Sequence, residues 1–521
     1  MIEIKKIIKY AGSVSAGTMV SRVFGYIRDM LVAYMFGAGM FADAFYAAFR
    51  IPNLIRRMLG EGSFSAAFIP VFSEYLHTKT KSETQKLINV VFTALTVVLL
   101  IFTILGVFFA PLLVKLIAYG FTSDPEKLQL TIELTRLMFP FLLFICLAAM
   151  LLALLNTLNS FFIPAIAPAN LSFAEIIYML ALAPLLAPGN QIKGLAISVI
   201  FGGLGHFVMQ YPVLRKLGWN LKFDFNFSHP GIKKIVFLMI PSIIGISVDQ
   251  INTFVDTICA SFLGDGSITA LYYSGRLMQL PLAIFGLALA TVSLPMMSKS
   301  VAVKDIDELK ETLNLSIRFS IIALVPAVAG LIAIGLPIIQ VLFERGKFDY
   351  AASLLTNNAL FYYSLGLPAF AVTKIFANTF FSFQDTKTPV KIAFIVMIFH
   401  VILCVVLMKP LGVGGLALAT SLCAYMNTAM LLYKLRKKIG AIGSTKILLS
   451  SIRACVAATM MGVFAYFIMQ INLPSIFLRL CISIVVSIAV FAILLKLFKS
   501  PEMEFILKTL NKKQISHIHS R

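Results

Sequence analysis

The sequence predicts an all-α protein that crosses a membrane many times, and three observations carry this prediction. Of the 521 residues, 59% are hydrophobic and only 13% are charged, which is too little charge to cover a soluble protein of this length. The mean hydropathy is +0.92. Apolar runs of about 20 residues, long enough to cross a hydrocarbon core, recur from one end of the chain to the other.

The apolar runs indicate fourteen membrane-spanning helices. Several are longer than one straight crossing needs, so we expect tilts, kinks or extensions past the bilayer. The first run continues past any plausible cleavage point and is therefore assigned to a helix rather than to a signal peptide. The predicted spans are 10–36, 41–76, 87–114, 132–157, 160–186, 194–213, 235–262, 268–297, 313–340, 354–383, 392–408, 414–433, 447–470 and 476–495.

The net charge of +21 is explained by topology. With the N-terminus in the cytoplasm, the cytoplasmic connections and termini hold 27 Lys and Arg residues and the opposite connections hold 6. This bias is typical of a multi-pass protein with both termini in the cytoplasm. The basic residues therefore indicate orientation and contact with anionic membrane lipids, and we expect no nucleic-acid partner.

The two halves of the chain look related. Gly37, Gly39 and Tyr46 recur 227 residues later as Gly264, Gly266 and Tyr273. Six helices per repeat give two parallel lobes around a central cavity, an arrangement typical of transporters. The predicted division is an N-lobe over 1–213, a cytoplasmic connection over 214–234, a C-lobe over 235–436, two extra helices over 437–498 and a cytoplasmic tail over 499–521.

Charged residues lie at membrane depth in the first spans. Charge at the bilayer centre costs at least about 2.5–3.5 kcal/mol and usually faces a cavity or a partner. Arginine forks bind phosphate or carboxylate oxygens, so the excess of arginine over acid predicts an anionic substrate, most simply a phosphate or pyrophosphate. The candidate binding residues are Arg22, Arg28, Arg56 and Arg276. Three acids and one further arginine could tune or gate the site: Asp29, Asp43, Glu61 and Arg57.

A second polar group lies in the predicted span 235–262. Asn252 and Asp256 are one helical turn apart, and their oxygens could bind Na⁺, or Asp256 could carry a proton. A polar contact between helices would explain them equally well. The six cysteines, at 146, 259, 404, 423, 455 and 481, are predicted to be small buried hydrophobes rather than disulfides or metal ligands.

No enzyme motif is present: the chain has no HExxH, no GxSxG at a strand-to-helix turn and no P-loop. We therefore expect a transporter without a cofactor, apart from a coupling ion such as Na⁺.

Four stretches resemble the MurJ/MviN family of lipid II flippases, within the multidrug/oligosaccharidyl-lipid/polysaccharide exporter superfamily. They are "SRVFGYIRD", "FGAGMFADAFYAAFRIPNLIRRMLGEGSFSAAFIPVFSEY", "YYSGRLMQLP" and "QDTKTPVKIA". The resemblance covers essentially the whole chain and is most specific over 21–75.

The resemblance implies a flippase of the bacterial inner membrane for lipid II, the undecaprenyl-pyrophosphate-linked precursor of peptidoglycan. It implies substrate contacts at Arg22, Arg28, Arg56, Arg276 and Asp43, Na⁺ binding at the position of Asp256, and a groove for the lipid tail over 437–498. We expect a monomer that works by alternating access. The alternatives are a flippase of another polyprenyl-pyrophosphate-linked oligosaccharide, such as O-antigen, and a membrane scaffold that binds such lipids without moving them.

Overall fold

The computed structural model describes residues 2–505. Within that range the chain forms helices joined by short connections and no strand, so the prediction of an all-helical fold is confirmed. For some residues inside helices only the backbone is described. These are residues 2–16, 59–61, 244–246, 248 and 249.

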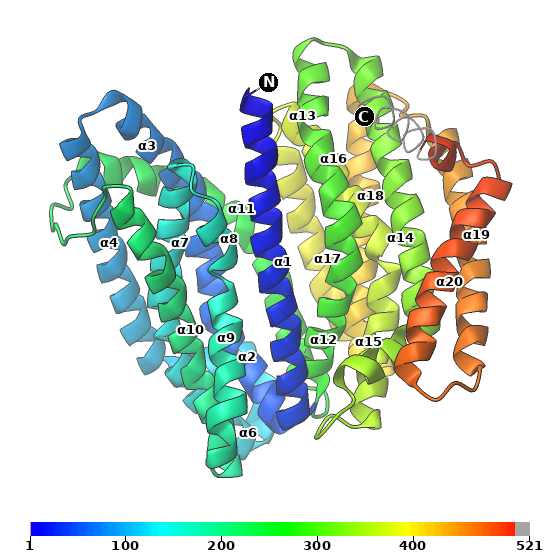
Figure 1. Cartoon of the computed structure of the whole chain (residues 1–521), viewed down its shortest axis with the longest axis horizontal. Helices are drawn as coiled ribbons and strands as arrows, with labels where there is room; N and C mark the ends of the chain where they lie inside the picture. Colours follow the sequence, from blue (N-terminus) through cyan, green and yellow to red (C-terminus); the bar gives the residue numbers. More distant parts are fainter. Residues whose placement is uncertain (1, 506–521) are drawn as a thin grey trace, which may run out of the picture. The chain divides into compact units, whose positions relative to one another are not determined.

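The chain divides into two compact units (Figure 1). Unit 1 is Met1–Thr269 with Arg345–Phe348, and unit 2 is Ala270–Glu344 with Asp349–Arg521. This division follows contacts, whereas the predicted lobes follow the internal repeat and separate at 214–234. The lobes stay a prediction.

Unit 1 is built from long helices interrupted by short helical segments. Its elements are α1 (Ile2–Phe36), α2 (Met40–Ile55), η1 (Arg56–Phe64), α3 (Ser65–Thr78), α4 (Lys81–Phe108), α5 (Ala110–Ile117), η2 (Tyr119–Ser123), α6 (Pro125–Met138), α7 (Phe141–Thr157), α8 (Phe162–Ile166), α9 (Ala169–Ile177), η3 (Tyr178–Leu182), η4 (Ala183–Leu185), α10 (Pro188–Lys216) and α11 (Pro230–Ser261).

Unit 2 begins inside α12, whose first residues belong to unit 1. Its elements are α12 (Ser267–Pro281), η5 (Leu282–Leu287), α13 (Ala288–Ala302), α14 (Ile306–Phe343), α15 (Tyr350–Leu365), α16 (Leu367–Ser382), α17 (Lys387–Leu411), α18 (Val413–Ile439), α19 (Ser444–Gln470) and α20 (Ile476–Leu497).

Eight helices of the described residues are long and apolar enough to cross a membrane. Two further pairs, α6 with α7 and α15 with α16, pass the same test together but bend by 40° and 42°. The bends fall at Pro140 and at Gly366, which precedes Pro368, where proline cannot donate a helical hydrogen bond. The predicted kinks are therefore present, and the count of fourteen spans stays a prediction.

The predicted span 41–76 consists of three segments. Its middle, η1, is a π-helix of nine residues, in which backbone hydrogen bonds reach one residue further than in an α-helix. The Ser63 hydroxyl donates to the Met58 carbonyl five residues earlier. Such wide turns often occur at functional sites, and η1 carries Arg56 and Arg57.

Stacked aromatic rings form the core of unit 1. Phe64, Phe68 and Phe72 recur every four residues, so they share one helix face, and their ring centres lie 5.0 and 5.6 Å apart. Leucines and isoleucines of α4 and α7 pack against them. Trp219, beyond the end of α10, meets the Phe72 ring edge-on at 6.3 Å.

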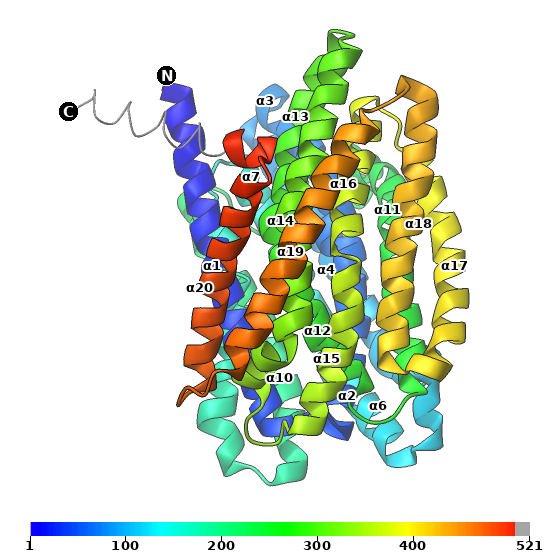
Figure 2. The same ribbon diagram turned by 90° about the vertical axis from the view of Figure 1, so that its right-hand side faces the viewer.

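In unit 2, α14 is the central helix. It contacts α13, α15 and α16, and α19 packs along it with α20 beside them (Figure 2). Ala454 and Ala457 of α19 are fully buried next to Ile322 of α14, because small side chains let membrane helices approach closely. The predicted lipid-tail groove at 437–498 involves α19 and α20 and stays a prediction.

The start of the predicted tail is folded onto unit 2. Glu502 is 1% exposed, forms an ion pair with Arg318 of α14 and accepts a hydrogen bond from Ser450 of α19 at 2.9 Å. These contacts join the segment around Glu502 to α14 and α19. Residues 506–521 of the predicted tail lie outside the described residues.

Candidate functional site

Arg28 of α1 is buried in an ion cluster. Its Nε and Nη2 donate to Oδ1 of Asp29 over 3.0 and 2.7 Å, and Nε lies 3.2 Å from Oε2 of Glu175 on α9. The exposed fractions of Arg28, Asp29 and Glu175 are 8%, 1% and 2%. Since α1 and α9 pack together, the cluster lies between two helices of unit 1.

The cluster holds one guanidinium between two carboxylates inside a helix bundle. Burial disfavours a lone ion, so the two carboxylates stabilise the charged guanidinium and fix its orientation. A phosphate offers the same oxygen acceptors and could take their place. Sequence reasoning included Asp29 but missed Glu175, although a single acid within the apolar stretch "NLSFAEIIYML" is itself a signal.

Asp43 lies near the start of α2, and its carboxylate is 1% exposed. Oδ2 accepts from Lys127 Nζ at 2.9 Å and from the Gly266 amide at 2.9 Å. Oδ1 accepts from the Thr269 amide at 2.9 Å and the Thr269 hydroxyl at 2.7 Å. These four bonds fill the acceptor positions of the carboxylate.

These bonds make Asp43 the N-terminal cap of α12. The first amides of a helix lack partners within the helix and carry partial positive charge, and here Asp43 supplies the acceptor from another helix. Gly266, the residue before α12, has φ +84°, and a Cβ there would lie 2.6 Å from the Ala38 carbonyl oxygen. Only glycine fits this turn, which explains the glycine that precedes α12.

Lys127 of α6 completes this second cluster and was missed from the sequence. Its Nζ contacts Asp43 at 2.9 Å and Asp265 at 2.7 Å, and it lies 4.3 Å from the centre of the Phe121 ring. The side chain is 4% exposed. Because α6 begins just before Lys127, sequence reasoning assigned this lysine to a connection.

The arginines of α2 and η1 contact polar groups of unit 1. Arg50 Nη1 donates to the Thr253 carbonyl of α11 at 2.8 Å and to the Thr257 hydroxyl. Arg56 Nε donates to Asn53 Oδ1 at 2.9 Å. Arg57 is exposed. Arg50 thus fastens α2 to α11, whereas Arg56 is held locally at the start of the π-helix.

The other predicted site residues are Arg22, Arg276 and Glu61. Arg22 is exposed on α1. Arg276 of α12, in unit 2, is half-buried, and its guanidinium lies 5.7 Å from the centre of the Tyr272 ring, within the range of a cation–π interaction. The side chain of Glu61 lies outside the described residues.

Asn252 and Asp256 are half-buried on α11, one turn apart. Oδ1 of Asn252 is buried and has no hydrogen-bond partner among the described residues. An unsatisfied buried oxygen costs free energy, and a hard cation with oxygen ligands would satisfy it. The donor chemistry of the pair therefore fits Na⁺.

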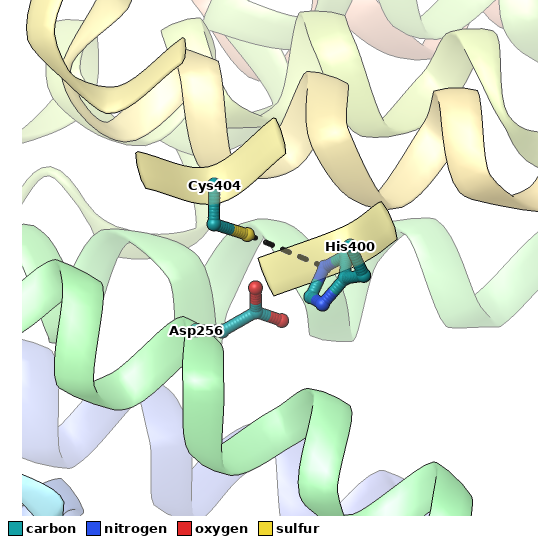
Figure 3. Close-up of side chains that lie close together, drawn as sticks. All are labelled: Asp256, His400 and Cys404. Atoms are coloured by element: carbon teal, nitrogen blue, oxygen red, sulfur yellow. Dashed lines mark hydrogen bonds between the residues drawn. The ribbon is translucent and has the colours of Figure 1, made fainter. Parts of the chain in front are cut away.

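The prediction for the cysteines is partly wrong. Four are buried, but Cys455 and Cys481 are exposed on α19 and α20, where helix phase turns them away from the neighbouring helices. Cys404 also has a polar partner. Its thiol lies 3.4 Å from Nε2 of His400, one turn earlier on α17 (Figure 3), a pair that the i, i+4 spacing alone indicates.

The chain is similar to known proteins over most of its length. A family described as "Lipid II flippase MurJ" matches residues 32–487. A probable lipid II flippase MurJ of Vibrio cholerae is 39% identical over 434 residues, which are 82% of this chain and 82% of that protein. One from Buchnera aphidicola is 34% identical over 478 residues, 91% of this chain and 93% of that protein.

A solved structure gives the same result in three dimensions. "Lipid II flippase MurJ, inward closed conformation" superimposes with a TM-score of 0.79 and 29% identity, and the match covers 93% of this chain and 98% of the other. From the sequence match and the superposition together, this chain belongs to the lipid II flippase MurJ family.

Proposed function

We propose that this protein is a membrane transporter that moves lipid II from the inner to the outer leaflet of the cytoplasmic membrane. Its family is described as "Lipid II flippase MurJ", and its relatives from Vibrio cholerae and Buchnera aphidicola are named as probable lipid II flippases. The observation in this chain that supports it best is the buried Arg28 cluster, since a guanidinium inside a membrane helix bundle suits a phosphate-bearing substrate.

In the proposed mechanism, arginine forks bind the pyrophosphate while the polyprenyl tail stays in lipid. Arg28 exchanges one of its carboxylate partners for a phosphate oxygen and keeps its charge satisfied throughout. The other proposed contacts are Arg22, Arg56 and Arg276. Asp43 acts by fixing the start of α12. It does not touch phosphate, because an ionised carboxylate has no hydrogen-bond donor to offer a phosphate oxygen.

The proposed transport follows alternating access in a monomer. Both termini lie in the cytoplasm, an orientation that the distribution of basic residues favours. Na⁺ is the proposed coupling ion. Asn252 Oδ1 and the Asp256 carboxylate would hold it, and the unsatisfied Asn252 oxygen is the observation that supports this choice.

The test is genetic rescue combined with a lipid assay. A bacterium depleted of its own flippase receives this chain, and lipid II in the outer leaflet is measured. We expect the wild type to restore it and Arg28→Ala to fail at equal membrane abundance. Arg28→Lys, which keeps the charge but loses the fork, should restore less than the wild type.

Arg136→Ala is the matched control, because Arg136 is an exposed arginine of α6 outside the proposed site. It should rescue like the wild type. Full rescue by Arg28→Ala would contradict the proposed site. Restored growth without lipid II in the outer leaflet would contradict the proposed substrate and favour another polyprenyl-linked glycan.

A further inference from the structure

The connection between α10 and α11 displays a row of exposed aromatic side chains. We call residues 220–227 the aromatic strap. Every second residue at its end is a phenylalanine, and polar residues alternate with them. The exposed fractions are large for such side chains: Phe223 63%, Phe225 67% and Phe227 46%.

The aromatic strap is held against α4 by a regular set of hydrogen bonds. Two residues of extended chain advance about 6.6 Å and one four-residue step along a helix advances about 6 Å, so backbone amides of the strap meet successive polar side chains of α4. The bonds are Asn220 N to Gln85 Oε1 at 3.1 Å, Lys222 N to Asn89 Oδ1 at 3.1 Å and Asp224 N to Thr93 Oγ1 at 2.8 Å.

This alignment places the phenylalanines beside a membrane-spanning surface. α4 has a mean hydropathy of 2.8 over its most apolar window, and its exposed apolar residues follow Thr93 directly, from Val98 to Phe108. Phe223 packs on Phe92 with ring centres 5.3 Å apart. The exposed rings of the strap therefore continue the apolar surface of α4 toward its N-terminal end.

The charges around the strap are those of a membrane interface. Lys222 is exposed beside Phe223 in the strap, and Arg215 and Lys216 are exposed in the last turn of α10 before it. The one acid of the strap, Asp224, is half-buried. Basic side chains near a bilayer attract anionic headgroups, and segments that lie in the interface combine such charges with Phe, Trp or Leu. A water-facing loop would leave three large rings exposed without compensation.

We propose that the aromatic strap is a membrane anchor, with Phe223, Phe225 and Phe227 inserted at the interface of a bilayer that contains anionic phospholipid. The anchor fixes the connection between α10 and α11 at a constant depth along α4. This function is independent of the transported substrate and of the arginine site.

The single tryptophan of the chain makes the proposal directly testable by fluorescence. The full-length protein carrying Trp219→Phe and Phe225→Trp is reconstituted in vesicles of phosphatidylethanolamine and phosphatidylglycerol whose acyl chains are brominated near the headgroup. We expect these lipids to quench the new tryptophan strongly and aqueous iodide to quench it weakly.

Asn226→Trp in the same Trp219→Phe background is the matched control, since Asn226 is the polar neighbour of Phe225. It should show the reverse pattern, with quenching by iodide severalfold greater than by brominated lipid. If Phe225→Trp instead behaves like Asn226→Trp, the strap faces water or a protein partner and the proposal is wrong.

Trp219 packs on Phe72, so its replacement could disturb folding. Phe225→Trp is therefore also measured with Trp219 retained, and the lipid quenching beyond that of the wild type is attributed to position 225. No additional quenching in a folded protein would overturn the anchor.

Discussion

Two of the buried carboxylates in unit 1, Asp43 and Asp29, are held in different ways. Asp43 accepts hydrogen bonds from two backbone amides at the start of α12 and from the side chains of Lys127 and Thr269. Asp29 faces the guanidinium of Arg28, which also reaches Glu175 on another helix. Backbone amides at a helix start are fixed by the fold, whereas a side-chain ion pair can change partner. Asp43 therefore has a structural role, and the partner exchange that we propose for Arg28 depends on the second kind of contact.

The largest loss of stability is expected for Asp43→Ala. The change removes the cap of α12 and a partner of the buried Lys127, and breaking a buried ion pair destabilises by about 3 kcal/mol or more. Thermal unfolding in detergent should show a large fall in midpoint. Asp43→Asn keeps one carbonyl oxygen that can accept a hydrogen bond from a backbone amide of α12, so its unfolding midpoint should fall less than that of Asp43→Ala. Equal midpoints for Asp43→Ala and the wild type would refute the structural role.

Thr269→Val tests one bond of the same cap. It removes the hydroxyl that donates to Asp43 at 2.7 Å and keeps the side-chain shape, and a hydrogen bond to a charged group contributes about 1.5–3 kcal/mol. The unfolding midpoint should fall by less than for Asp43→Ala. Thr122→Val is the control. It removes an exposed hydroxyl of η2 that donates to the Tyr119 carbonyl, and because water can replace this bond, the midpoint should stay nearly unchanged.

Glu175→Gln tests the exchange assigned to Arg28. With one carboxylate neutralised, Arg28 should bind a pyrophosphate-headed lipid more tightly, by up to about tenfold in Kd, or 1.4 kcal/mol. Titration of the purified protein with a short-chain polyprenyl pyrophosphate measures it. Glu133→Gln, in a half-buried pair with Lys193, should bind like the wild type. Weaker binding by Glu175→Gln would mean that the carboxylate orients Arg28 rather than competing with phosphate.

The smallest effect is expected for Glu502, whose carboxylate is held outside the predicted spans. Burial opposes its ionisation, but hydrogen bonds from Ser500, its own amide and Ser450, with the charge of Arg318, hold its pKa below the ordinary value of 4.5. The ionised group therefore stabilises the fold above pH 4.5, and that stability is lost as the pH falls through its folded pKa. Glu502→Gln should lose this pH dependence of the unfolding midpoint.

The sequence was sufficient for the all-helical fold but not for the distant partners of the buried charges. Hydropathy and proline positions report local structure, so the kinks near Pro140 and Pro368 were expected in kind. Glu175 and Lys127 meet Arg28 and Asp43 only after helices distant in sequence pack together. No local pattern specifies which faces meet, and the π-helix of η1 shows no signal beyond its two glycines.

The π-helix has a consequence for how α2 and α3 are phased. Adding or removing one residue in an α-helix rotates everything beyond it by about 100°, which would turn the Phe64, Phe68 and Phe72 stack away from the core of unit 1. The wide turns of η1 take up one residue more than α-helical turns would. That extra residue sets the rotation of α3 relative to α2, and so it directs the three stacked rings toward the core.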